Sequence, residues 1–545
     1  TQVVDGWLDA LLETFEQFPD TGLAGARLIY GDGRLQEAGG IIYKDGGGWN
    51  YGRLDDADRP EYQFTREVDY CSGACIALPT GLFRELDGFD TRYSPAYYED
   101  TDMAFRVREK GLKVRVQAAA TIVHHEGVTS GTDINSGTKR YQAINREKFL
   151  ERWKDVLVNH SPPIIDHRDR NEIRRARDFR LKGKVLIIDA YTPEPNQDSG
   201  SLRLVYLMDC FQKLGYGVTF IPDNRAFAGH YTTDLQKRGV EIIYTPWLPS
   251  LQKFFSERGR DFDFVMVSRH YVASRYTRLI RKHCPQAKFI FDTVDLHYLR
   301  EERQAELENS LPLQRAAAQT KRSELGVINA ADATLVVSPV EKTVLAEAAP
   351  KAKVHVLSNV HKVVGSRKPF AERKDMFFVG GYQHPPNVDA VQWFVKKIWP
   401  LIRAEIPDAQ FHLIGSKATE TVQALHGNGV LVHGFVESLE PSLDDCRLAV
   451  APLRFGAGIK GKVNISMSRG QPVVATPCAV EGMFAEPGRD ILVAESAEDF
   501  AREVIRLYRD EELWNLVSAS GLENVNRYFS VDTARLGLQE LLKSL

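Results

Sequence analysis

Hydrophobic residues in the second half of the chain recur in short continuous runs, and amphipathic segments separate these runs. The run KVLIIDA at 184–190 predicts a buried strand, the segment 202–215 predicts an amphipathic helix, and VTFIPD predicts the next strand. The alternation continues through FDFVMVS, KFIFDTVD, ATLVVS and KVHVLSN, and it restarts at DMFFVGG, residues 375–381. It predicts an α/β fold with two doubly wound parallel sheets, whose ligands bind beyond the carboxyl ends of the strands.

The first part of the chain shows a different pattern, in which short strands mix with short helices. Its glycine-rich stretch, GDGRLQEAGGIIYKDGGGWNYGR, predicts turns and hairpins. A charged segment with two adjacent prolines follows, and such a segment is typical of a linker. We therefore expect four parts, namely a domain at 1–155, a linker at 156–181, and sheet domains at 182–365 and 366–545.

The chain begins with Thr1, directly before a helical pattern. Trp7, Leu8, Leu11, Leu12 and Phe15 share one face of this helix. A natural start is not expected there, so the pattern predicts a processed or truncated chain.

Composition narrows the classes of protein. A chain of 545 residues is too long for one hydrophobic core, and 43% hydrophobic with 26% charged residues is typical of globular domains. No apolar run approaches the roughly 20 residues of a membrane-spanning helix. A net charge of −3 gives no general reason to bind nucleic acid. The six cysteines lack metal-ligand spacing and indicate buried thiols in a reducing, cytoplasmic compartment.

Three acids stand at the front of a predicted helix in SPAYYEDTDMAFRVREKGLKV, residues 94–114. Glu99, Asp100 and Asp102 complement the positive end of the helix, and Asp102 can pair with Arg106 one turn later. Helix capping alone explains the cluster. The sequence around the acids has to decide whether they have another role.

A glycine-rich loop in RLAVAPLRFGAGIKGKVNISMSRGQPVVATPCAVEGM, residues 447–483, is the strongest local signal for chemistry. The pattern predicts strand, loop and helix. Gly456 and Gly458 let backbone amides approach an anion at the helix N-terminus, while Lys460 and Lys462 supply positive charge. This combination predicts a diphosphate site, and a plain glycine turn with solvated lysines is the alternative.

A second loop, DAYTPEPNQDSGSLRL, also leaves a strand and enters a helix. Gly200 and Ser201 at its end either cap the helix or close over a phosphorylated ligand. Asp295 and His297 in FDTVDLHYLREER follow another strand, where a doubly wound sheet presents functional side chains. His297 is a candidate for polarising a group or transferring a proton, although an ordinary loop histidine fits the pattern as well.

Residues 182–545 resemble a GT-B glycosyltransferase of family 4 type. The first glycine loop, FFVGGYQHPPNVDAVQWF, LSNV, PLRFGAGIKGK, GQPVVATPCAVEGM and a final helix pair follow the family's order. The resemblance implies two Rossmann-like domains, with the nucleotide sugar bound mainly by the second and the acceptor mainly by the first, and with final helices that cross back. The donor site is then expected to contain Gly200, Ser201, Gly380, Gly381, Gly456, Gly458, Lys460, Lys462 and Glu481.

One departure from that family concerns its two glutamates spaced by seven residues. They would fall at Ala457 and Ile465, so neither is present. Glu481 is the nearby candidate replacement. The resemblance implies retention of the anomeric configuration, and the missing glutamates leave retaining and inverting transfer both open.

Residues 1–155 resemble the C-terminal part of a GT-A glycosyltransferase of family 2 type, close to rhamnosyltransferases of surface polysaccharide assembly. The motifs are DGWLDALL, GLAGARLIYGDGRLQEAGG, VDYCSGACIAL, GFDTRYSPAYYEDTDMAFRVREKG and IVHHEG. The resemblance implies that Asp100 is the base for the acceptor hydroxyl, with Glu99 beside it. It also implies that His124 helps to hold a divalent cation, Mg²⁺ or Mn²⁺. The family's acidic metal motif would precede Thr1, so this module is expected to be inactive in the present chain.

The sequence thus predicts a glycosyltransferase that moves a sugar from a nucleoside diphosphate donor to a growing surface polysaccharide or lipid-linked glycan. The GT-B module is expected to act without a metal cofactor, using Asp295 and His297. A non-catalytic module that binds glycan or scaffolds other enzymes is the alternative. We expect no nucleic-acid partner and a cytoplasmic location, which leaves room for peripheral association with the inner face of the membrane. Donor, acceptor, linkage and oligomeric state stay open.

Overall fold

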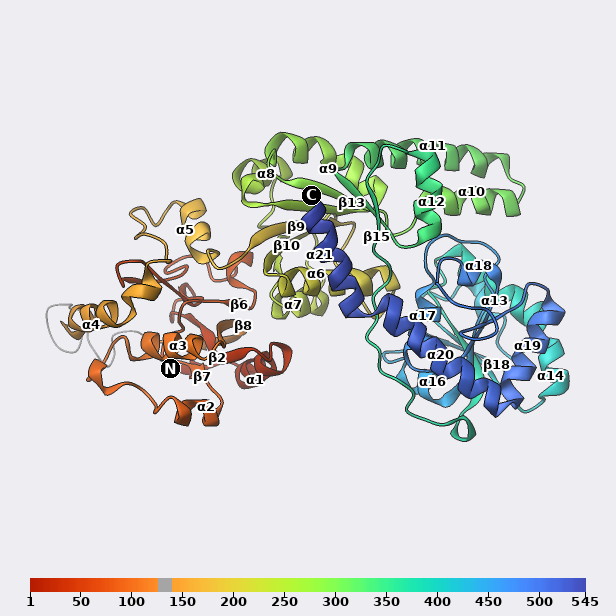
Figure 1. Cartoon of the computed structure of the whole chain (residues 1–545), viewed down its shortest axis with the longest axis horizontal. Coiled ribbons are helices and arrows are strands. Elements are labelled where there is room, and N and C mark those ends of the chain that lie inside the picture. The colour runs from red at the N-terminus through yellow and green to blue at the C-terminus, as the bar shows by residue number, and fades with distance from the viewer. Residues whose placement is uncertain (126–139) are drawn as a thin grey trace. The chain divides into compact units, whose positions relative to one another are not determined.

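A computed structural model of the chain describes residues 1–125 and 140–545 (Figure 1). By their contacts these residues form two compact units. One is Thr1–Lys184 with Gly215–Phe254, and the other is Val185–Leu214 with Phe255–Leu545. Helices and strands alternate in both, so the predicted α/β class is confirmed. The two sheet domains expected at 182–365 and 366–545 fall mainly within the second unit.

A mixed sheet forms the centre of the first unit. Its long strands β2 (Thr21–Ile29) and β8 (Lys113–Val123) run parallel, and the order is β1-β8-β2-β3, with β6 on β8 and β7 on β2. β4 and β5 form the antiparallel hairpin that the glycine-rich stretch predicts. The other elements of this unit are β1 (Gln2–Val3), α1 (Trp7–Gln17), β3 (Leu35–Glu37), β4 (Gly40–Ile42), β5 (Gly48–Asn50), β6 (Arg66–Glu67), β7 (Ile76–Ala77), α2 (Thr80–Glu85), α3 (Glu99–Glu109), α4 (Arg140–Leu157), α5 (Arg170–Arg177), β10 (Tyr216–Pro222), α7 (His230–Lys237) and β11 (Glu241–Ile242).

Asp102 joins α3 to its neighbours. Its buried carboxylate accepts hydrogen bonds from Arg106 Nε (2.7 Å), Tyr93 Oη (3.1 Å) and Trp153 Nε1 of α4 (2.9 Å). The predicted pair with Arg106 is therefore confirmed. Because every one of these partners belongs to the protein, Asp102 has a structural role, and only the two acids before it remain candidates for chemistry.

The segment predicted as a linker packs into the first unit. Within it, Ile164, Ile173 and Ala176 are buried in one cluster with residues of the glycine-rich region, such as Tyr51 and Tyr62. The two prolines do prevent helix at their own positions, but α5 starts soon after them at Arg170. The apolar residues of this short helix recur at helical spacing and share one face. They therefore pack into the core although most of their neighbours in sequence are charged.

We predict that Asp169→Ala destabilises the first unit by about 1 kcal/mol, because Asp169 is the N-cap of α5. Its Oδ1 accepts the amides of Asn171 (2.9 Å) and Glu172 (3.1 Å). Urea unfolding followed by tryptophan fluorescence measures the change. Asp155→Ala, at an exposed position of α4, is the control and is expected to match the parent chain. Equal midpoints for both variants would contradict the packed role of this segment.

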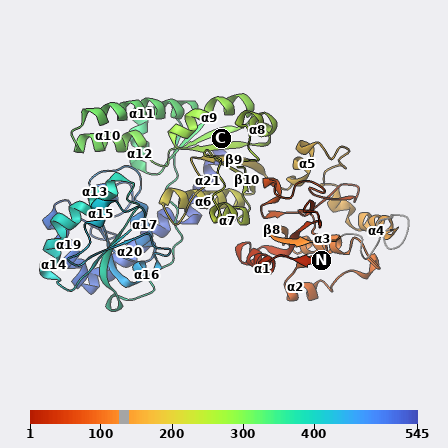
Figure 2. The ribbon, with the colours of Figure 1, turned by 180° about the vertical axis from the view of Figure 1, so that it is seen from behind.

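The second unit contains a parallel sheet with the order β9-β12-β13-β14-β15. KVLIIDA forms β9 as predicted, and its residues Val185 to Ile188 are completely buried. Helices α10 and α11 lie side by side as a long hairpin in this part (Figure 2). The elements here are β9 (Gly183–Asp189), α6 (Ser199–Lys213), α8 (Leu251–Arg258), β12 (Phe264–Ser268), α9 (His270–His283), β13 (Lys288–Asp292), α10 (His297–Leu307), α11 (Leu311–Ala330), β14 (Ala333–Val336), α12 (Pro339–Ala348) and β15 (Val354–Val356).

A second sheet in the same unit has the order β18-β17-β16-β19-β20-β21. Its parallel strands carry the largest hydrophobic cluster described, which includes Phe377, Leu413 and Val474. The elements are β16 (Lys374–Val379), α13 (Pro385–Trp393), α14 (Trp399–Glu405), β17 (Phe411–Ile414), α15 (Glu420–Gln423), β18 (Val430–Gly434), α16 (Glu440–Asp445), β19 (Cys446–Ala451), α17 (Gly461–Ser468), β20 (Val473–Ala475), α18 (Pro477–Val480), β21 (Leu492–Val493), α19 (Ala497–Arg509), α20 (Glu511–Phe529) and α21 (Val531–Ser544).

The last helix packs on the first sheet domain of this unit. α21 lies against α6, while α20 packs on α17 of the second sheet domain. The sulfur of Cys210 on α6 lies 3.8 Å from the carbonyl oxygen of Val531 on α21. The chain therefore returns to its first Rossmann-like sheet, as the GT-B resemblance implies.

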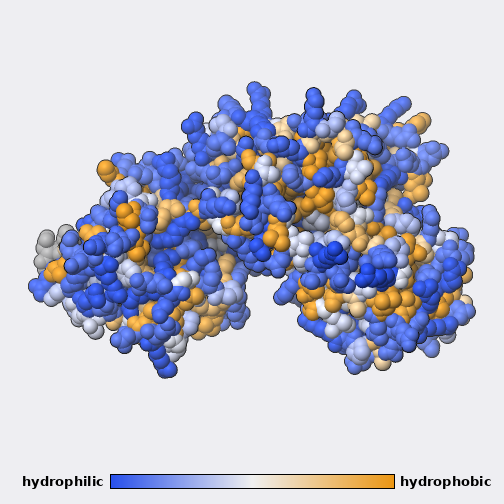
Figure 3. All heavy atoms as spheres, in the orientation of Figure 1, coloured by the Kyte–Doolittle hydropathy of each residue, from blue (hydrophilic) through white to orange (hydrophobic). Residues whose placement is uncertain are grey.

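The helix at the start of the chain differs from its predicted apolar face. Leu11 is buried, but the side chains of Leu8 and Leu12 are 48% and 53% exposed. The part of α1 that packs on β2 and β8 is therefore narrower than the sequence pattern. Elsewhere hydrophilic residues cover most of the visible surface, with scattered hydrophobic residues between them (Figure 3).

Candidate functional site

Two loops of the second unit meet where its two sheet domains face each other. The loop between β19 and α17 places Gly458 and Gly461 against the other sheet domain. A Cβ at Gly461 would lie 2.3 Å from Cβ of Ser199, and one at Gly458 would lie 3.2 Å from Cβ of Asp295. The contact at Gly461 excludes a side chain, and Gly458 combines a tight contact with a φ of +65° that favours glycine. The loop therefore provides bare backbone at the point where the predicted donor and acceptor sides meet.

Lys462 lies in the first turn of α17 and contacts the other glycine motif of the same sheet domain. Its Nζ donates to Oδ1 of Asn387 and lies 4.1 Å from the ring centre of Phe378. A Cβ at Gly380 would lie 3.0 Å from this nitrogen, and the carbonyl of Gly381 accepts from Nδ2 of Asn387 (2.8 Å). The structure therefore brings Gly380, Gly381 and Lys462 together, as the predicted donor site requires.

The two lysines of the loop have different surroundings. Nζ of Lys460 folds back on the carbonyl oxygens of Ala457 (2.9 Å) and Gly458 (2.6 Å). Burial and the neighbouring Lys460 lower the pKa of Lys462 to about 7, and burial also lowers the pKa of Lys460. Both lysines are half-buried, and among the described residues neither makes an ion pair with a carboxylate. An anionic ligand would relieve the repulsion between their charged forms.

The loop after β9 mainly caps α6. Asp198 is the N-cap, and its carboxylate accepts the amide of Ser201 (2.8 Å) and the hydroxyl of Ser201 (2.7 Å). Ser201 is therefore already satisfied, which favours the capping interpretation for its side chain. Gly200 lies beside it, with Val294 3.2 Å from the position of a Cβ. The expected contact of Gly200 and Ser201 with a donor stays a prediction.

His297 begins α10 and faces carboxylates on one side. Its Nδ1 lies 3.1 Å from the carbonyl oxygen of Asp295, 3.5 Å from Oδ1 of Asp295 and 3.7 Å from Oε1 of Glu324. Burial lowers the pKa of His297, but these carboxylates outweigh it and the net shift is upward. Asp295 in turn binds Arg300. The imidazole is thus held by Nδ1, and Nε2 is the ring nitrogen left for a substrate.

Two buried glutamates, which the sequence analysis missed, hold the backbone around His297 in place. Glu324 of α11 accepts the amides of His297 (3.3 Å) and Tyr298 (3.1 Å) at the start of α10. Glu341 of α12 accepts the amides of Leu296 (2.9 Å) and Val337 (3.0 Å). Both fix the loop that carries Asp295. No local motif marks them, because their partners are distant in sequence.

Glu481 is held by an arginine of the opposite sheet domain. Arg303 of α10 makes a two-pronged ion pair with it, with N–O distances of 2.6 and 2.8 Å, and also donates to the carbonyl of Gly456 (2.7 Å). Arg303 was not identified from the sequence. The pair ties α10 to the glycine loop and occupies the carboxylate of Glu481. The role of Glu481 as a replacement carboxylate for the donor stays a prediction.

Ala457 and Ile465 stand where the family's two glutamates would be. Ile465 is partly buried and packs against the core of the second sheet domain. Its neighbour Asn464 is completely buried, and its Oδ1 lies 3.4 Å from Nδ2 of Asn359 in the LSNV motif. This amide pair joins the two sheet domains beneath the glycine loop.

The first unit places its acid pair at the start of α3. Oδ2 of Asp100 accepts the amide of Gly73 (2.8 Å), and Oδ1 accepts the amide of Thr101 (2.7 Å). Burial raises the pKa of Asp100, and burial together with Asp100 raises the pKa of Glu99. A raised pKa suits a carboxylate that takes up a proton.

A third carboxylate lies near this pair. Glu37 on β3 is completely buried, and its Oε1 accepts the amide of Ser72 (3.0 Å). Burial raises the pKa of Glu37 to about 8. Its neighbour Gln36 contacts Nδ1 of His124 through Oε1 (3.1 Å).

His124 has no cluster of metal ligands around it. Within residues 1–125 and 140–545, no three His, Cys, Asp or Glu side chains converge as metal ligands. The residues described therefore do not fit a divalent cation at His124 by themselves. The last two residues of the IVHHEG motif lie outside the described part of the chain.

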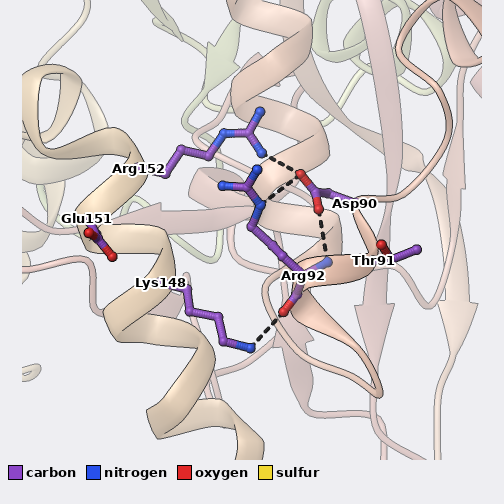
Figure 4. Close-up of a pocket in the computed structure, with 6 residues that line it drawn as sticks. All are labelled: Asp90, Thr91, Arg92, Lys148, Glu151 and Arg152. Carbon is purple, nitrogen blue, oxygen red and sulfur yellow. Dashed lines mark hydrogen bonds and ion pairs between the residues drawn. The ribbon is translucent and has the colours of Figure 1, made fainter.

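A pocket of about 520 Å³ lies between the residues before α3 and helix α4 (Figure 4). Its arginines, Arg92 and Arg152, both bind the carboxylate of Asp90, at 2.9 and 2.7 Å. Lys148 donates to the carbonyl oxygen of Arg92 (2.7 Å). Because these cations already have partners, the pocket gives no strong reason to expect a bound anion.

Comparison with known proteins connects this geometry to a family. Residues 373–510 match the family model described as Glycosyl transferases group 1. The predicted glycosyltransferase resemblance is confirmed. The matched segment contains the glycine loop, both lysines and Glu481.

Two curated relatives each match about a quarter to a third of this chain. The O-antigen biosynthesis protein RfbC of Myxococcus xanthus is 30% identical over 138 residues, which are 24% of this chain and 11% of that protein. The N-acetylglucosaminyl-diphospho-decaprenol L-rhamnosyltransferase of Mycobacterium tuberculosis is 28% identical over 196 residues, which are 32% of this chain and 64% of that protein. The matches thus span less than two thirds of either relative.

Solved structures show the same GT-B fold. A sucrose-phosphate synthase from Thermosynechococcus elongatus matches with a TM-score of 0.51 and 14% identity, covering 67% of this chain and 99% of that chain. Anabaena HepE in complex with UDP-glucose matches with a TM-score of 0.52 and 15% identity, covering 66% of this chain and all of that chain. At this identity the likeness establishes the fold, and the GT-B class predicted from the sequence is confirmed.

Proposed function

We propose that the chain transfers a sugar from a nucleoside diphosphate sugar to a growing surface polysaccharide or lipid-linked glycan, and that its GT-B module carries out the transfer. The carrying observation is the loop with Lys460 and Lys462, which lies against Asp295 and Ser199 of the other sheet domain. The match to group 1 glycosyl transferases supports the reaction type. The names of the curated relatives support the polysaccharide context.

In this proposal the protein stabilises the departing diphosphate. Lys460, Lys462 and the first amides of α17 place positive charge where the leaving group develops negative charge. His297, oriented through Nδ1, presents Nε2 to the reacting sugar or leaving group as a hydrogen-bond donor. Asp295 and Glu324 favour the charged form of this imidazole, because they raise its pKa against the effect of burial. No metal cofactor is proposed for the GT-B module.

For the first unit we propose an acceptor-side role. In an intact GT-A module, Asp100 would be the base and Glu99 would support it. Such a module would also hold a divalent cation such as Mg²⁺ or Mn²⁺, with His124 as one ligand. We also propose that the protein is cytoplasmic. It would contact the membrane peripherally, where a lipid-linked acceptor is held. None of the helices in the described part of the chain combines the length and the apolar character that a bilayer crossing needs.

Nucleotide binding tests the proposal directly. Thermal unfolding of the full chain is measured with UDP-, GDP-, dTDP- and CMP-linked sugars. A ligand at about 100 times its dissociation constant is expected to add roughly 2.7 kcal/mol to the free energy of unfolding. Stabilisation by one nucleotide class supports the donor site. The absence of any shift across the panel would contradict it and would favour a glycan-binding scaffold.

Assigning transfer to the GT-B module leads to a further prediction. Asp100→Asn in this chain is expected to leave the rate of transfer unchanged, because a base in the other module takes no part in the reaction. The rate is measured with the nucleotide sugar identified by the panel, and circular dichroism checks the fold. A loss of transfer by a folded Asp100→Asn chain would show that the first unit contributes to catalysis.

A further inference from the structure

Helix α9 carries a stripe of basic residues on its exposed side. Its 14 residues include three arginines and a lysine but no aspartate or glutamate. Four exposed residues recur at spacings of four, three and four positions, so they share one face of the helix. They are Tyr271, Arg275, Arg278 and Lys282. The buried face, by contrast, consists of Val272, Ala273, Tyr276 and Ile280.

Helix α11 runs beside α9 in the same direction. Nδ1 of His270, at the start of α9, lies 3.3 Å from the hydroxyl of Ser323. The guanidinium of Arg281, near the end of α9, donates to the carbonyl oxygen of Ala330, one to two turns further along α11. Both helices lie along the same edge of the second unit in the two views (Figure 1, Figure 2). The second half of α11 is therefore next to the basic stripe of α9.

α11 adds an exposed stripe of its own. Lys321 and Glu324 face α10, because they bind Glu302 and the amide of His297. Four exposed residues recur at spacings of four, four and three positions on the opposite side of α11. They are Leu311, Arg315, Gln319 and Arg322. In both helices the exposed stripe lies away from the packed side, so the two stripes form one outward face.

Four bases on this outward face make no ion pair with a carboxylate in the described part of the chain. Arg322 donates to a carbonyl oxygen of its own helix (3.3 Å). Arg281 is not among the four, because it pairs with Asp332 at 2.9 Å. We call the four residues the basic face, and they are Arg278, Lys282, Arg315 and Arg322.

Two residues with apolar surface border the basic face. Tyr271 begins the stripe of α9 and is 40% exposed, and Leu311 begins the stripe of α11 and is 67% exposed. At a membrane, bases bind lipid phosphates while tyrosine and leucine enter the headgroup region. A nucleic acid would use only the charges. The turn before α11 also carries exposed Glu306 and Glu308, so the attraction to anions is strongest along α9.

The outward face also begins next to the proposed transfer site. The ring centre of Tyr271 lies 6.0 Å from the ring centre of His297, the histidine that acts on the substrate in the proposed mechanism. A membrane that covers this face would therefore bring a lipid-linked acceptor close to His297.

We propose that the basic face binds the surface of a membrane that contains anionic phospholipids. The four cations contact the lipid phosphates, and Tyr271 and Leu311 enter the headgroup region. This inference deepens the peripheral membrane contact proposed above and rests on it. It does not depend on which sugar is transferred.

Vesicle sedimentation with the full chain tests this contact. One set of vesicles is pure phosphatidylcholine, and the other is about 70% phosphatidylcholine with about 30% phosphatidylglycerol. The chain is expected to bind the anionic vesicles at least about tenfold more tightly, because each base near such a surface adds to the attraction. This preference is expected to disappear when the ionic strength rises from about 0.1 M to about 1 M. Equal binding to both vesicles, no binding, or tighter binding to a short DNA duplex at the same phosphate concentration would overturn the proposal.

A double variant locates the contact. Arg278→Gln combined with Lys282→Gln is expected to weaken binding to the anionic vesicles by about 10- to 30-fold, roughly three- to fivefold for each charge removed. The matched control is Lys396→Gln combined with Lys397→Gln, which removes the same charge from exposed positions of the second sheet domain and is expected to bind like the parent chain. Circular dichroism checks the fold of both. Equal binding by the two double variants would refute the assignment.

Nucleotide binding separates this inference from the transfer proposal. Both double variants are expected to keep the thermal shift with the preferred nucleotide sugar, because neither changes the glycine loop. A normal thermal shift without vesicle binding would overturn the membrane contact alone. Vesicle binding without any nucleotide shift would overturn the transfer proposal and leave the membrane contact in place.

Discussion

His297→Ala is expected to lower the rate of sugar transfer by a factor of about 100 to 10,000 while nucleotide binding is retained. The imidazole is held by Asp295 and Glu324 through Nδ1, so Nε2 is the nitrogen that acts on the substrate in the proposed mechanism. The proposed diphosphate contacts belong to the opposite loop, so binding is expected to survive when the ring is removed. Turnover at saturating donor and thermal shift with the same nucleotide separate the two effects.

The neighbouring His270 provides a matched control. Its ring centre lies 5.1 Å from that of His297, but its Nδ1 contacts the hydroxyl of Ser323. His270→Ala is expected to change turnover much less. Because the pKa of His297 is raised, the charged ring is present at low pH and is lost as pH rises through that pKa. Turnover of the parent chain is therefore expected to fall on the alkaline side. Similar losses in both variants would indicate a packing defect.

Lys462→Ala is expected to weaken binding of the nucleotide sugar by about 10- to 150-fold, and more than Lys460→Ala does. Lys462 is in the first turn of α17 and its nitrogen lies close to Gly380, whereas Lys460 is bound to carbonyls of its own loop. Isothermal titration of each variant with the preferred nucleotide provides the comparison. Equal, parent-like affinity in both would rule out a diphosphate site at this loop.

The affinity of the parent chain is also expected to depend on pH through Lys462. Its pKa is about 7 without ligand, and a diphosphate would raise it, because an anion favours the charged amine. The charged form predominates below that pKa and becomes complete as the pH falls further, so affinity is highest on the acidic side. Above that pKa, binding takes up a proton, and affinity falls about tenfold per unit until the pKa of the complex is reached. Lys462→Ala is expected to lose this slope.

The buried strands and the glycine loops were predictable because they depend on local pattern. KVLIIDA could only be a buried strand, and glycines between a strand and a helix indicate close backbone approach. The sequence therefore predicted the two sheets and the order of the loops, while the donor-binding role of Lys462 stays a prediction. The partners of these groups were not predictable: Arg303 binds Glu481 across 178 positions, and Glu341 binds the amide of Leu296 across 45.

The sequence also could not predict which residues of an amphipathic pattern are buried. The apolar spacing in α1 is the same for Leu8, Leu11 and Leu12, yet only Leu11 is buried. The segment that contains α5 shows the opposite case, since its charge predicts solvent contact while Ile173 packs in a core. Pattern identifies the element, and tertiary contacts decide which of its residues are covered.

The packing of α21 on α6 makes one thiol a natural reporter. Cys210 is buried, and the carbonyl of Val531 lies next to its sulfur. A thiol reagent reaches this side chain only when the last helix moves away, because burial also raises the pKa of Cys210 to about 11 and suppresses the reactive thiolate. The labelling rate of Cys210 therefore measures how often the chain end detaches, and a nucleotide that tightens the module would slow it.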